Sequence, residues 1–336
     1  MDSFLKGKNV LVTGGTGSIG SAIVKKAIKD KAKNIRVFSN DEFGQYELEK
    51  ELGKNTNVSF WLGDIRDESR IEYVVKNMDY VFHAAALKHV DRCEVNPNES
   101  ILTNIIGTKN LINASQKANI KKVIFISTDK AVNPVSVMGA SKLLAEKLIS
   151  AEAFHENSKT IFASVRFGNV LNTRGSILPF IEEQIKHGGP ITLTDKKMIR
   201  FFMTKNDAVN LIISAAKIAK GGEIFVLKMP IIRLNDLFES LKKILGPKYG
   251  HHPSSIKTKI IGMKPGEKLV EELLTEIEIK RVLETKEFFI ILPNLTKKIK
   301  QKYSNAKIPK EIDIHFKKIK PLNDKQILKM LKELFD

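Results

Sequence analysis

Short β-branched and aromatic runs alternate with longer helical stretches through the first half of the chain. Six runs have the length of buried strands, over residues 9–13, 35–38, 58–62, 79–83, 123–127 and 160–166. Between them, apolar positions recur at helical spacing over 21–29, 46–52, 69–76, 98–117 and 139–154. Such alternation predicts βαβ units, in which helices cover both faces of a parallel sheet. We therefore expect an α/β fold with a doubly wound parallel sheet.

The second half of the chain has a looser rhythm. Proline and glycine interrupt shorter elements after residue 168, for example at 188–190 and 265–266. We interpret residues 168–336 as mainly a smaller substrate-side region packed on the sheet, with some later segments returning to it. The segment 321–336 predicts an amphipathic helix, whose apolar positions are Ile327, Leu328, Met330, Leu331 and Leu334.

The composition excludes several classes of protein. At 42% hydrophobic residues the chain can bury a normal core, so it is not globally disordered. No run approaches the ~18 apolar residues of a membrane span, and the first residues carry no signal-peptide pattern. The single cysteine, Cys93, excludes a disulfide scaffold and a cysteine-rich metal site. Together these features favour a cytoplasmic protein.

The chain is strongly basic, with 56 Lys and Arg against 38 Asp and Glu and a formal net charge of +18. The lysines are dispersed and no zinc-finger or RNP pattern accompanies them, so we expect no nucleic-acid partner. A positive field of this kind attracts a polyanionic small molecule or an anionic membrane face. The pair His251–His252 has no third ligand at metal-binding spacing, and we expect no metal site.

A glycine-rich turn follows the first strand and opens the first helix. Gly14, Gly17 and Gly20 are spaced three apart within a segment that also holds Thr13, Thr16, Ser18 and Ile19. The glycines allow a tight turn, backbone approach to a pyrophosphate and close packing of helix on strand, while the helix N-terminus attracts the phosphates. We therefore expect a dinucleotide-binding domain of the Rossmann type over residues 1–167.

The end of the second strand distinguishes between the two nicotinamide cofactors. An NAD site usually has a carboxylate there, but this chain has Ser39 followed by Asn40. A hydroxyl and an amide can bind a 2′-phosphate without repelling it, so we favour NADP, with NAD as the alternative. Further cofactor contacts are expected from Asp64, Ile65, Ala84, Ala85, Ala86 and Ser127 at later strand ends, and from Asn104 on the helix predicted over 98–117.

The fifth strand ends in Ser127-Thr128-Asp129-Lys130-Ala131, and this stretch carries a family resemblance. Further motifs of the same kind occur at 84–90, 166–171, 174–176, 188–195, 198–204 and 264–269. On these motifs the chain resembles the extended short-chain dehydrogenase/reductases. More narrowly, it is similar to the UDP-N-acetylglucosamine 4,6-dehydratases of polysaccharide biosynthesis, over roughly residues 8–293.

The resemblance implies a cofactor-recycling removal of water from UDP-N-acetylglucosamine. Oxidation at C4 makes the C5 hydrogen acidic, water leaves across C5 and C6, and a hydride returns to C6. In this family Lys130 would be the C5 base and Asp129 the acid toward C6. Lys130 must then be neutral for part of the cycle, and we expect burial and the positive charge of Lys142 to lower its pKa.

One position departs from the superfamily pattern. A tyrosine usually stands four residues before the lysine of the catalytic helix, but here Met138 precedes Lys142. A thioether cannot accept the C4 hydroxyl proton, so the base for that step is unassigned, and Thr128 or Ser127 could relay the proton. Lys142 remains able to bind the nicotinamide ribose. Met138 could also be simple core packing.

The substrate contacts are expected mainly in the second half of the chain. Arg174 and Arg200 are candidates for bidentate diphosphate contacts. Glu267 would bind ribose hydroxyls, as the resemblance implies, although Lys264 departs from the arginine frequent in the family. The remaining candidates are Lys88, Asn169, Ser176, Thr194 and Met198. We expect a homo-oligomer that binds UDP-N-acetylglucosamine.

Two other functions remain open at this point. A UDP-hexose 4-epimerase shares the cofactor, the substrate class and the first hydride transfer, but it needs neither an acid nor a C5 base. A non-catalytic NADP-binding protein on the same fold would explain the missing tyrosine. The residues do not distinguish inversion from retention at C5.

Overall fold

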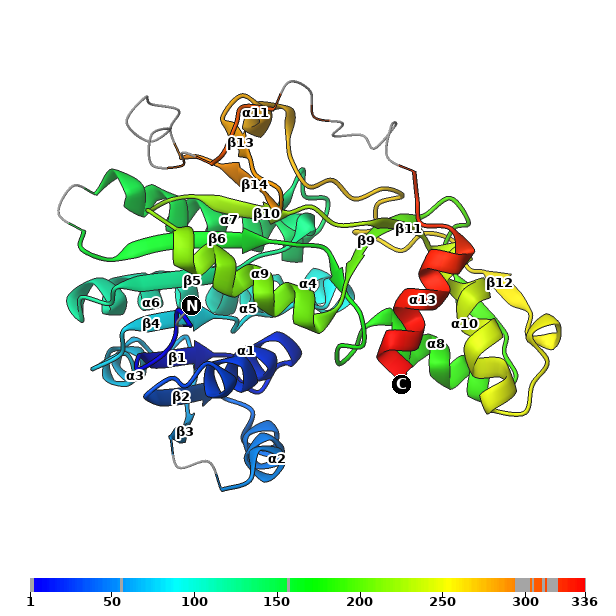
Figure 1. The fold of residues 1–336 in the computed structure, drawn as a ribbon, viewed down its shortest axis with the longest axis horizontal. Coiled ribbons are helices and arrows are strands. Elements are labelled where there is room, and N and C mark those ends of the chain that lie inside the picture. Colours follow the sequence, from blue (N-terminus) through cyan, green and yellow to red (C-terminus); the bar gives the residue numbers. More distant parts are fainter. Residues whose placement is uncertain are drawn as a thin grey trace.

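The computed structural model describes residues 3–54, 57–155, 158–293, 303, 305–309, 312 and 320–335. Within these residues, nine strands form one large sheet in the order β13-β14-β10-β6-β5-β4-β1-β2-β3 (Figure 1). The strands from β3 to β10 in this order run parallel, while β14 and β13 continue the sheet antiparallel. This arrangement confirms the predicted doubly wound α/β fold.

The six strands predicted from the sequence all exist, with ends that move by one residue at most. The strands of the large sheet are β1 (Asn9–Thr13), β2 (Asn34–Ser39), β3 (Val58–Leu62), β4 (Tyr80–His83), β5 (Lys122–Ile126), β6 (Ile161–Arg166), β10 (Ile224–Leu227), β13 (Val282–Glu284) and β14 (Phe288–Ile291). The order of the strands reverses between β1 and β4. In open α/β sheets, ligands bind beyond the carboxyl ends of the strands at such a point.

Four helices of this half begin one to four residues earlier than the apolar pattern indicates, and a polar side chain caps the first turn of three of them. They are α1 (Ser18–Lys29), α2 (Glu42–Leu52), α3 (Glu68–Val74), α4 (Val90–Val95), α5 (Pro97–Ser100), α6 (Gly107–Lys117) and α7 (Val137–Ala151). Asp41 accepts a hydrogen bond from Gly44 N and so starts α2, and Ser136 does the same for α7. The predicted helix 98–117 is wrong as one regular element, because a π-helical segment, Ile101–Ile106, separates α5 from α6.

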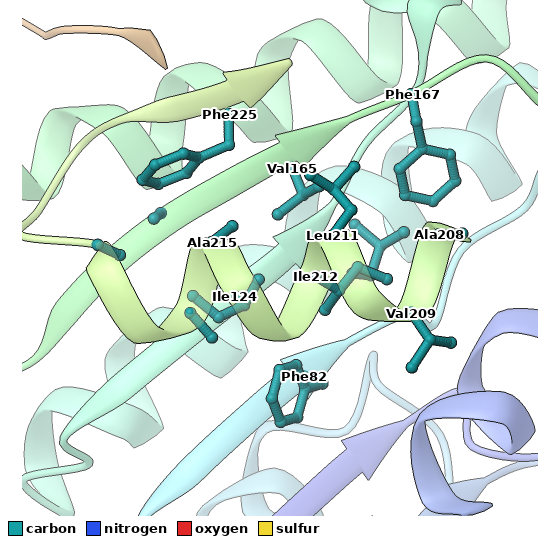
Figure 2. Close-up of a cluster of buried hydrophobic side chains, with 14 of the residues drawn as sticks. Phe82, Ile124, Val165, Phe167, Ala208, Val209, Leu211, Ile212, Ala215 and Phe225 are labelled. Atoms are coloured by element: carbon teal, nitrogen blue, oxygen red, sulfur yellow. The ribbon is translucent and has the colours of Figure 1, made fainter. Parts of the chain in front are cut away.

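Two hydrophobic cores hold the helices against the two faces of the sheet. Helices α1 and α9 (Lys205–Ile218) cover one face, while α3, α6 and α7 cover the other. Alternate residues of β1 serve the two cores, because Val10 and Val12 face α1 and Leu11 faces the opposite side. Figure 2 shows α9 lying across the central strands, with Leu211 and Ile212 directed at them.

A smaller lobe stands to one side of the sheet and has a core of its own (Figure 1). Its helices are α8 (Ile177–Lys186), α10 (Leu234–Lys248) and α13 (Asp324–Phe335), the last lying within the predicted segment 321–336. Two small sheets, β11-β9-β7 and β12-β8, connect it to the main body; their strands are β7 (Asn169–Val170), β8 (Ile191–Leu193), β9 (Ile199–Met203), β11 (Ile231–Arg233) and β12 (Thr258–Ile260). In the described ranges, every helix is too short or too polar to cross a bilayer.

A buried ion cluster ties the segment after residue 270 to the main sheet. Arg166, at the end of β6, is fully buried and pairs with Glu146 of α7 at 2.6 Å and with Glu278 of α11 (Glu276–Ile279) at 2.9 Å. Its guanidinium also donates to the carbonyl oxygen of Leu273 at 3.0 Å. Removing one partner of such a cluster leaves an uncompensated buried charge, so the segment is held firmly beside β6.

Candidate active site

A cavity of about 600 Å³ lies beyond the carboxyl ends of β1, β4, β5 and β6. The glycine-rich turn after β1 forms one wall, and Thr128, Lys130 and Lys142 line another. The turn before α8 closes it on the side of the smaller lobe. The cavity is large enough for parts of a cofactor and a sugar to meet.

The glycine-rich turn fits the phosphates of a dinucleotide. Gly14 has φ +63°, and a Cβ there would lie 2.6 Å from Ala85 N. A Cβ on Gly20 would lie 2.2 Å from the carbonyl oxygen of Gly14, so the helix and the turn touch. No side chain caps α1 at Gly17, which leaves its first N–H groups for an anion. Ser18 and Ile19 also line the cavity, as expected.

A polar cluster occupies the end of β2, where the adenosine ribose of a dinucleotide is expected. The Ser39 and Thr16 hydroxyls are 2.9 Å apart, and Asp41 N donates to Ser39 Oγ at 3.2 Å. Arg174 reaches this cluster from the turn before α8: its Nη2 donates to the carbonyl oxygen of Thr16, and its Nη1 lies 3.7 Å from Asp41 Oδ2. Arg174 was expected at the substrate diphosphate, and the structure places its guanidinium against the glycine-rich turn and Asp41.

The other cofactor candidates divide between cavity and scaffold. Ala84, Ala86 and Ser127 line the cavity, while Ala85 packs against Gly14. Thr13 bonds the buried His83 at 2.7 Å, and burial lowers the pKa of His83 to about 3, so its ring is neutral.

Four more of these candidates have partners within the protein scaffold. Asn40 Nδ2 donates to Asp64 Oδ2 at 3.3 Å, and Ile65 is buried against Gly107. The amide of Asn104 bonds the backbone of Leu87 and the hydroxyl of Ser141, so it connects the loop after β4 to α7. Asn104 therefore stabilises the wall of the site through its contacts with other protein groups.

The loop after β5 brings three polar side chains together. Thr128 Oγ1 and Lys130 Nζ each donate to Asp129 Oδ1 at 3.0 Å. Lys130 Nζ also lies 3.5 Å from Asn169 Oδ1, and both of these residues line the cavity. Asp129 is fully buried behind them, and its Oδ2 has no hydrogen-bond partner among the described residues. The arrangement can move a proton between the cavity and a buried carboxylate.

The expected lowering of the Lys130 pKa is wrong for the structure as it stands. Burial alone would lower the pKa of Lys130, but Asp129 and Glu271 outweigh it and hold the pKa above its ordinary value. Arg200 opposes the two carboxylates only in part. The ammonium form of Lys130 is therefore the resting form.

Lys142 is the buried lysine whose pKa falls. Its Nζ donates to the carbonyl oxygen of Ile126 at 2.6 Å and lies 4.0 Å from the centre of the Phe125 ring. Burial lowers the pKa of Lys142 to about 7, and Glu146, one turn later on α7, opposes this only in part. Met138, one turn earlier, is 4% exposed and also lines the cavity.

Glu271 belongs to this site although its surroundings in the sequence did not single it out. It is 4% exposed, and its Oε1 lies 3.6 Å from Lys130 Nζ and 3.9 Å from Arg200 Nε. It stands next to Glu272 in a charged stretch that looks solvated. Only the folded chain distinguishes the two.

The substrate candidates also separate into two groups. Lys88, Asn169 and Ser176 line the cavity, and Lys88 Nζ donates to the carbonyl oxygen of Arg174 at 2.5 Å. Four other substrate candidates do not line the cavity: Thr194, Met198, Arg200 and Glu267.

Each of these four has partners in the protein. Arg200 donates to the carbonyl oxygens of residues 199, 268 and 269, Thr194 contacts Met198 Sδ, and Glu267 accepts from Lys264 N. In the described part of the chain, no three His, Cys, Asp or Glu side chains gather as a metal ion would require.

Comparison with known proteins places this site in a family. The model of the family described as "Polysaccharide biosynthesis protein" matches residues 10–293. A Methanocaldococcus jannaschii protein named as an uncharacterized membrane protein is 50% identical, covering 99% of this chain and 98% of that one. The crystal structure of Pen from Bacillus thuringiensis has a TM-score of 0.83 at 48% identity, covering 88% of this chain and 90% of that one.

Relatives with a named activity include both dehydratases and epimerases. A Campylobacter jejuni UDP-N-acetylglucosamine 4,6-dehydratase (inverting) is 37% identical, covering 86% of this chain and 84% of that one. A Rickettsia canadensis UDP-glucose 4-epimerase is 38% identical, covering 84% and 82%. Both are enzymes that modify a nucleotide sugar. The chain therefore belongs to the polysaccharide biosynthesis family of extended short-chain dehydrogenase/reductases.

Proposed function

We propose that this protein is a UDP-N-acetylglucosamine 4,6-dehydratase that uses NADP and recycles it within each turnover. The observation that carries the proposal is the acid–base pair behind the cavity wall, in which Asp129 is fully buried and Lys130 reaches the cavity. Elimination of water needs an acid at the C6 hydroxyl and a base at C5, whereas 4-epimerisation needs neither of these two groups. The dehydratase relative from Campylobacter jejuni supports the same substrate class.

The cofactor is held by the glycine-rich turn and by the polar cluster at the end of β2. The N-terminus of α1 binds its diphosphate, and Ser39, Thr16 and Arg174 bind the 2′-phosphate. Lys142 binds the nicotinamide ribose from α7. When bound, the cofactor supplies a hydride acceptor for C4 and a hydride donor for C6.

Thr128 and Asp129 supply the proton path that the missing tyrosine leaves open. Thr128 lines the cavity and already donates to Asp129 Oδ1 at 3.0 Å. When C4 is oxidised, the hydroxyl proton of the sugar passes to Thr128 as the Thr128 proton passes to Asp129. The buried carboxylate becomes the stored acid for the next step.

The stored proton then leaves with the departing water. Asp129 returns it through Thr128 to the C6 hydroxyl, while the neutral amine of Lys130 takes the C5 hydrogen as a proton. After the hydride reaches C6, Lys130 gives a proton back to C5. Asp129 has gained one proton from C4 and lost one to water, so the protein ends each cycle unchanged.

The sugar nucleotide is bound between the two lobes. Its diphosphate meets Lys88 and the N-terminus of α8, where the Ser176 turn offers N–H groups. Asn169 binds the hexose beside Lys130. In this arrangement Arg174 binds the cofactor, and Arg200 holds the backbone beside the site.

NMR of the purified protein with UDP-N-acetylglucosamine and NADP tests the proposal. The expected product is a 4-keto-6-deoxy sugar, whose C5 configuration the spectrum also reports. Formation of the C4 epimer without loss of water would instead assign the 4-epimerase. Stoichiometric binding of the cofactor with neither product would assign a non-catalytic protein.

A further inference from the structure

We propose that Glu271 is a proton-holding group that acts through Lys130, receiving the ammonium proton so that Lys130 can serve as the C5 base. This inference rests on the proposed dehydratase function. It answers a difficulty that the site itself creates, because a lysine between two carboxylates is stable as the cation and a cation cannot take a proton. Some group has to accept the proton before elimination can begin.

The geometry around Lys130 leaves few acceptors. The charged groups that face its ammonium are Asp129 of the strand-end loop, Arg200 of β9 and Glu271. Arg200 is a guanidinium and does not accept a proton. Asp129 is taken by the Thr128 proton in the first half of the cycle. Glu271 is the carboxylate that remains, with its Oε1 3.6 Å from Lys130 Nζ.

Glu271 pairs with Lys130 and Arg200 through one carboxylate oxygen, Oε1. Its side chain is 4% exposed, and its Oε2 has no hydrogen-bond partner among the described residues. An unpartnered buried carboxylate oxygen is costly as an anion, so uptake of a proton removes part of that cost. Glu271 does not line the cavity and thus does not touch the sugar.

The surrounding scaffold fixes the carboxylate beside the lysine. Arg200 is held by the carbonyl oxygens of Lys268 and Leu269, just before Glu271, and Arg166 holds that of Leu273, just after it. The neighbouring Glu272 faces away and accepts from Asn133 Nδ2 at 2.8 Å. Adjacent carboxylates therefore have opposite surroundings, one inside the site and one outside it.

The proton count closes around this group. Protonation of Asp129 at the C4 step removes one of the two negative charges that stabilise the Lys130 cation. Lys130 then passes its proton to Glu271, so that an ammonium and a carboxylate become an amine and a carboxylic acid with no change in total charge. The amine takes the C5 proton, returns it after the hydride transfer to C6, and finally recovers its own proton from Glu271.

The test compares Glu271→Gln with the matched control Glu272→Gln. The glutamine keeps the size of the side chain but cannot hold the proton, so Lys130 has to release it to solvent. We expect solvent-deuterium incorporation at C5 and kcat to fall at least tenfold near neutral pH. Both should recover as the pH rises, since removal of Glu271 also lowers the pKa of Lys130. Glu272→Gln should follow the wild-type profile, and Glu271→Asp should restore part of the rate.

A second readout needs neither cofactor nor turnover. NMR of the protein labelled with ¹³C at the lysine side chains, with the Lys130 signal assigned by Lys130→Met, follows the titration of that amine. Glu271→Gln should lower its pKa, whereas Glu272→Gln should leave it in place. Thermal unfolding of each variant confirms that it is folded.

Three results would overturn the role of Glu271. They are a wild-type pH profile in Glu271→Gln, an equal loss of rate at every pH, and an unchanged Lys130 titration. Each of them leaves the dehydratase function standing, because wild-type protein still forms the 4-keto-6-deoxy product. Absence of that product from wild-type protein would instead overturn the proposed function and the role of Glu271 with it.

Discussion

Lys130 and Lys142 reach one cavity from two regions, the loop after β5 and helix α7, yet their pKa values move in opposite directions. Burial disfavours the charged form of both amines. At Lys142 burial wins and lowers the pKa to about 7. At Lys130 the carboxylates of Asp129 and Glu271 win and raise it. The partners within reach of each amine decide its charge.

The difference assigns the two lysines different tasks. Lys142 contacts a carbonyl oxygen and an aromatic ring, so it can lose its proton near neutral pH without breaking an ion pair. Lys130 cannot become neutral until a carboxylate beside it gives up its charge. The surroundings of Lys142 already allow its neutral form. Lys130 becomes neutral only when the reaction protonates a carboxylate beside it.

The largest expected effect comes from removing the lysine that has carboxylate partners. Lys130→Met should abolish C5 deuterium exchange and lower turnover by about a thousandfold or more, because Lys130 is the proposed C5 base. It should also lower the free energy of unfolding by roughly 2 kcal/mol, since Asp129 and Glu271 lose their shared cation. Solvent-exchange NMR and denaturant unfolding measure the two effects. Wild-type exchange in the variant would remove Lys130 from the mechanism.

The sequence predicts the parts of the site that local motifs mark better than the parts that only the fold brings together. The glycine spacing after β1 and the Asp129–Lys130 pair after β5 are local patterns, and the structure brings both to one cavity. Glu271 reaches the site across a long chain separation, and no local pattern marks it. Arg174 lies in a recognised motif, but its contacts with Thr16 and Asp41 could not be read from the sequence. The sequence predicted that the pKa of Lys130 would fall, because it did not show that Glu271 lies beside the amine. Together with Asp129, Glu271 raises that pKa.

The domain interpretation shows the same limit. Strands β10, β13 and β14 and helix α9 follow residue 168 but belong to the large sheet and its core. Their apolar runs are short, and nothing local distinguishes them from the smaller lobe. The π-helical segment Ile101–Ile106 likewise has an ordinary helical pattern, and the bonds of its Asn104 to Leu87 and Ser141 join residues far apart in the chain.

Removing the other lysine should have the opposite effect on stability. In the unfolded chain Lys142 keeps its proton up to an ordinary pKa of 10.5, whereas in the folded chain it loses it near pH 7. Between these values the unfolded state binds more protons, so wild-type stability rises with pH. The free energy of unfolding of Lys142→Met at pH 7 should therefore exceed that of wild type by roughly 2–4 kcal/mol. That gain should shrink toward pH 10.

Denaturant unfolding of wild type and Lys142→Met at pH 7 and pH 10 gives the measurement. Surface Lys325→Met, on the exposed side of α13, serves as the control and should change little at either pH. A loss of stability in Lys142→Met at pH 7 would show that its hydrogen bond to Ile126 outweighs the cost of burial. Removal of either lysine would then lower the stability of the protein.

A smaller effect is expected at the cofactor end of the cavity, away from both lysines. Ser39→Asp places a carboxylate where the 2′-phosphate is expected, and should weaken NADP binding about tenfold while sparing NAD. Arg174→Ala should weaken NADP less, because Ser39 and Thr16 remain. Titration of each variant with both cofactors measures this. Unchanged NADP affinity in Ser39→Asp would rule out the 2′-phosphate contact.

The smallest effect is expected at Met138, the residue one turn before Lys142. Met138→Leu conserves volume and apolarity at a position that is 4% exposed, so it should keep most of the activity and cost under about 1.5 kcal/mol. Met138→Tyr restores the common superfamily arrangement, but Thr128 and Asp129 already provide a path for the C4 proton. The tyrosine should therefore not exceed wild-type turnover, and its ring would crowd the sugar. Steady-state turnover of both variants decides the point, because a severe loss in Met138→Leu or a large gain in Met138→Tyr would show that the C4 proton leaves by the α7 side and not through Thr128.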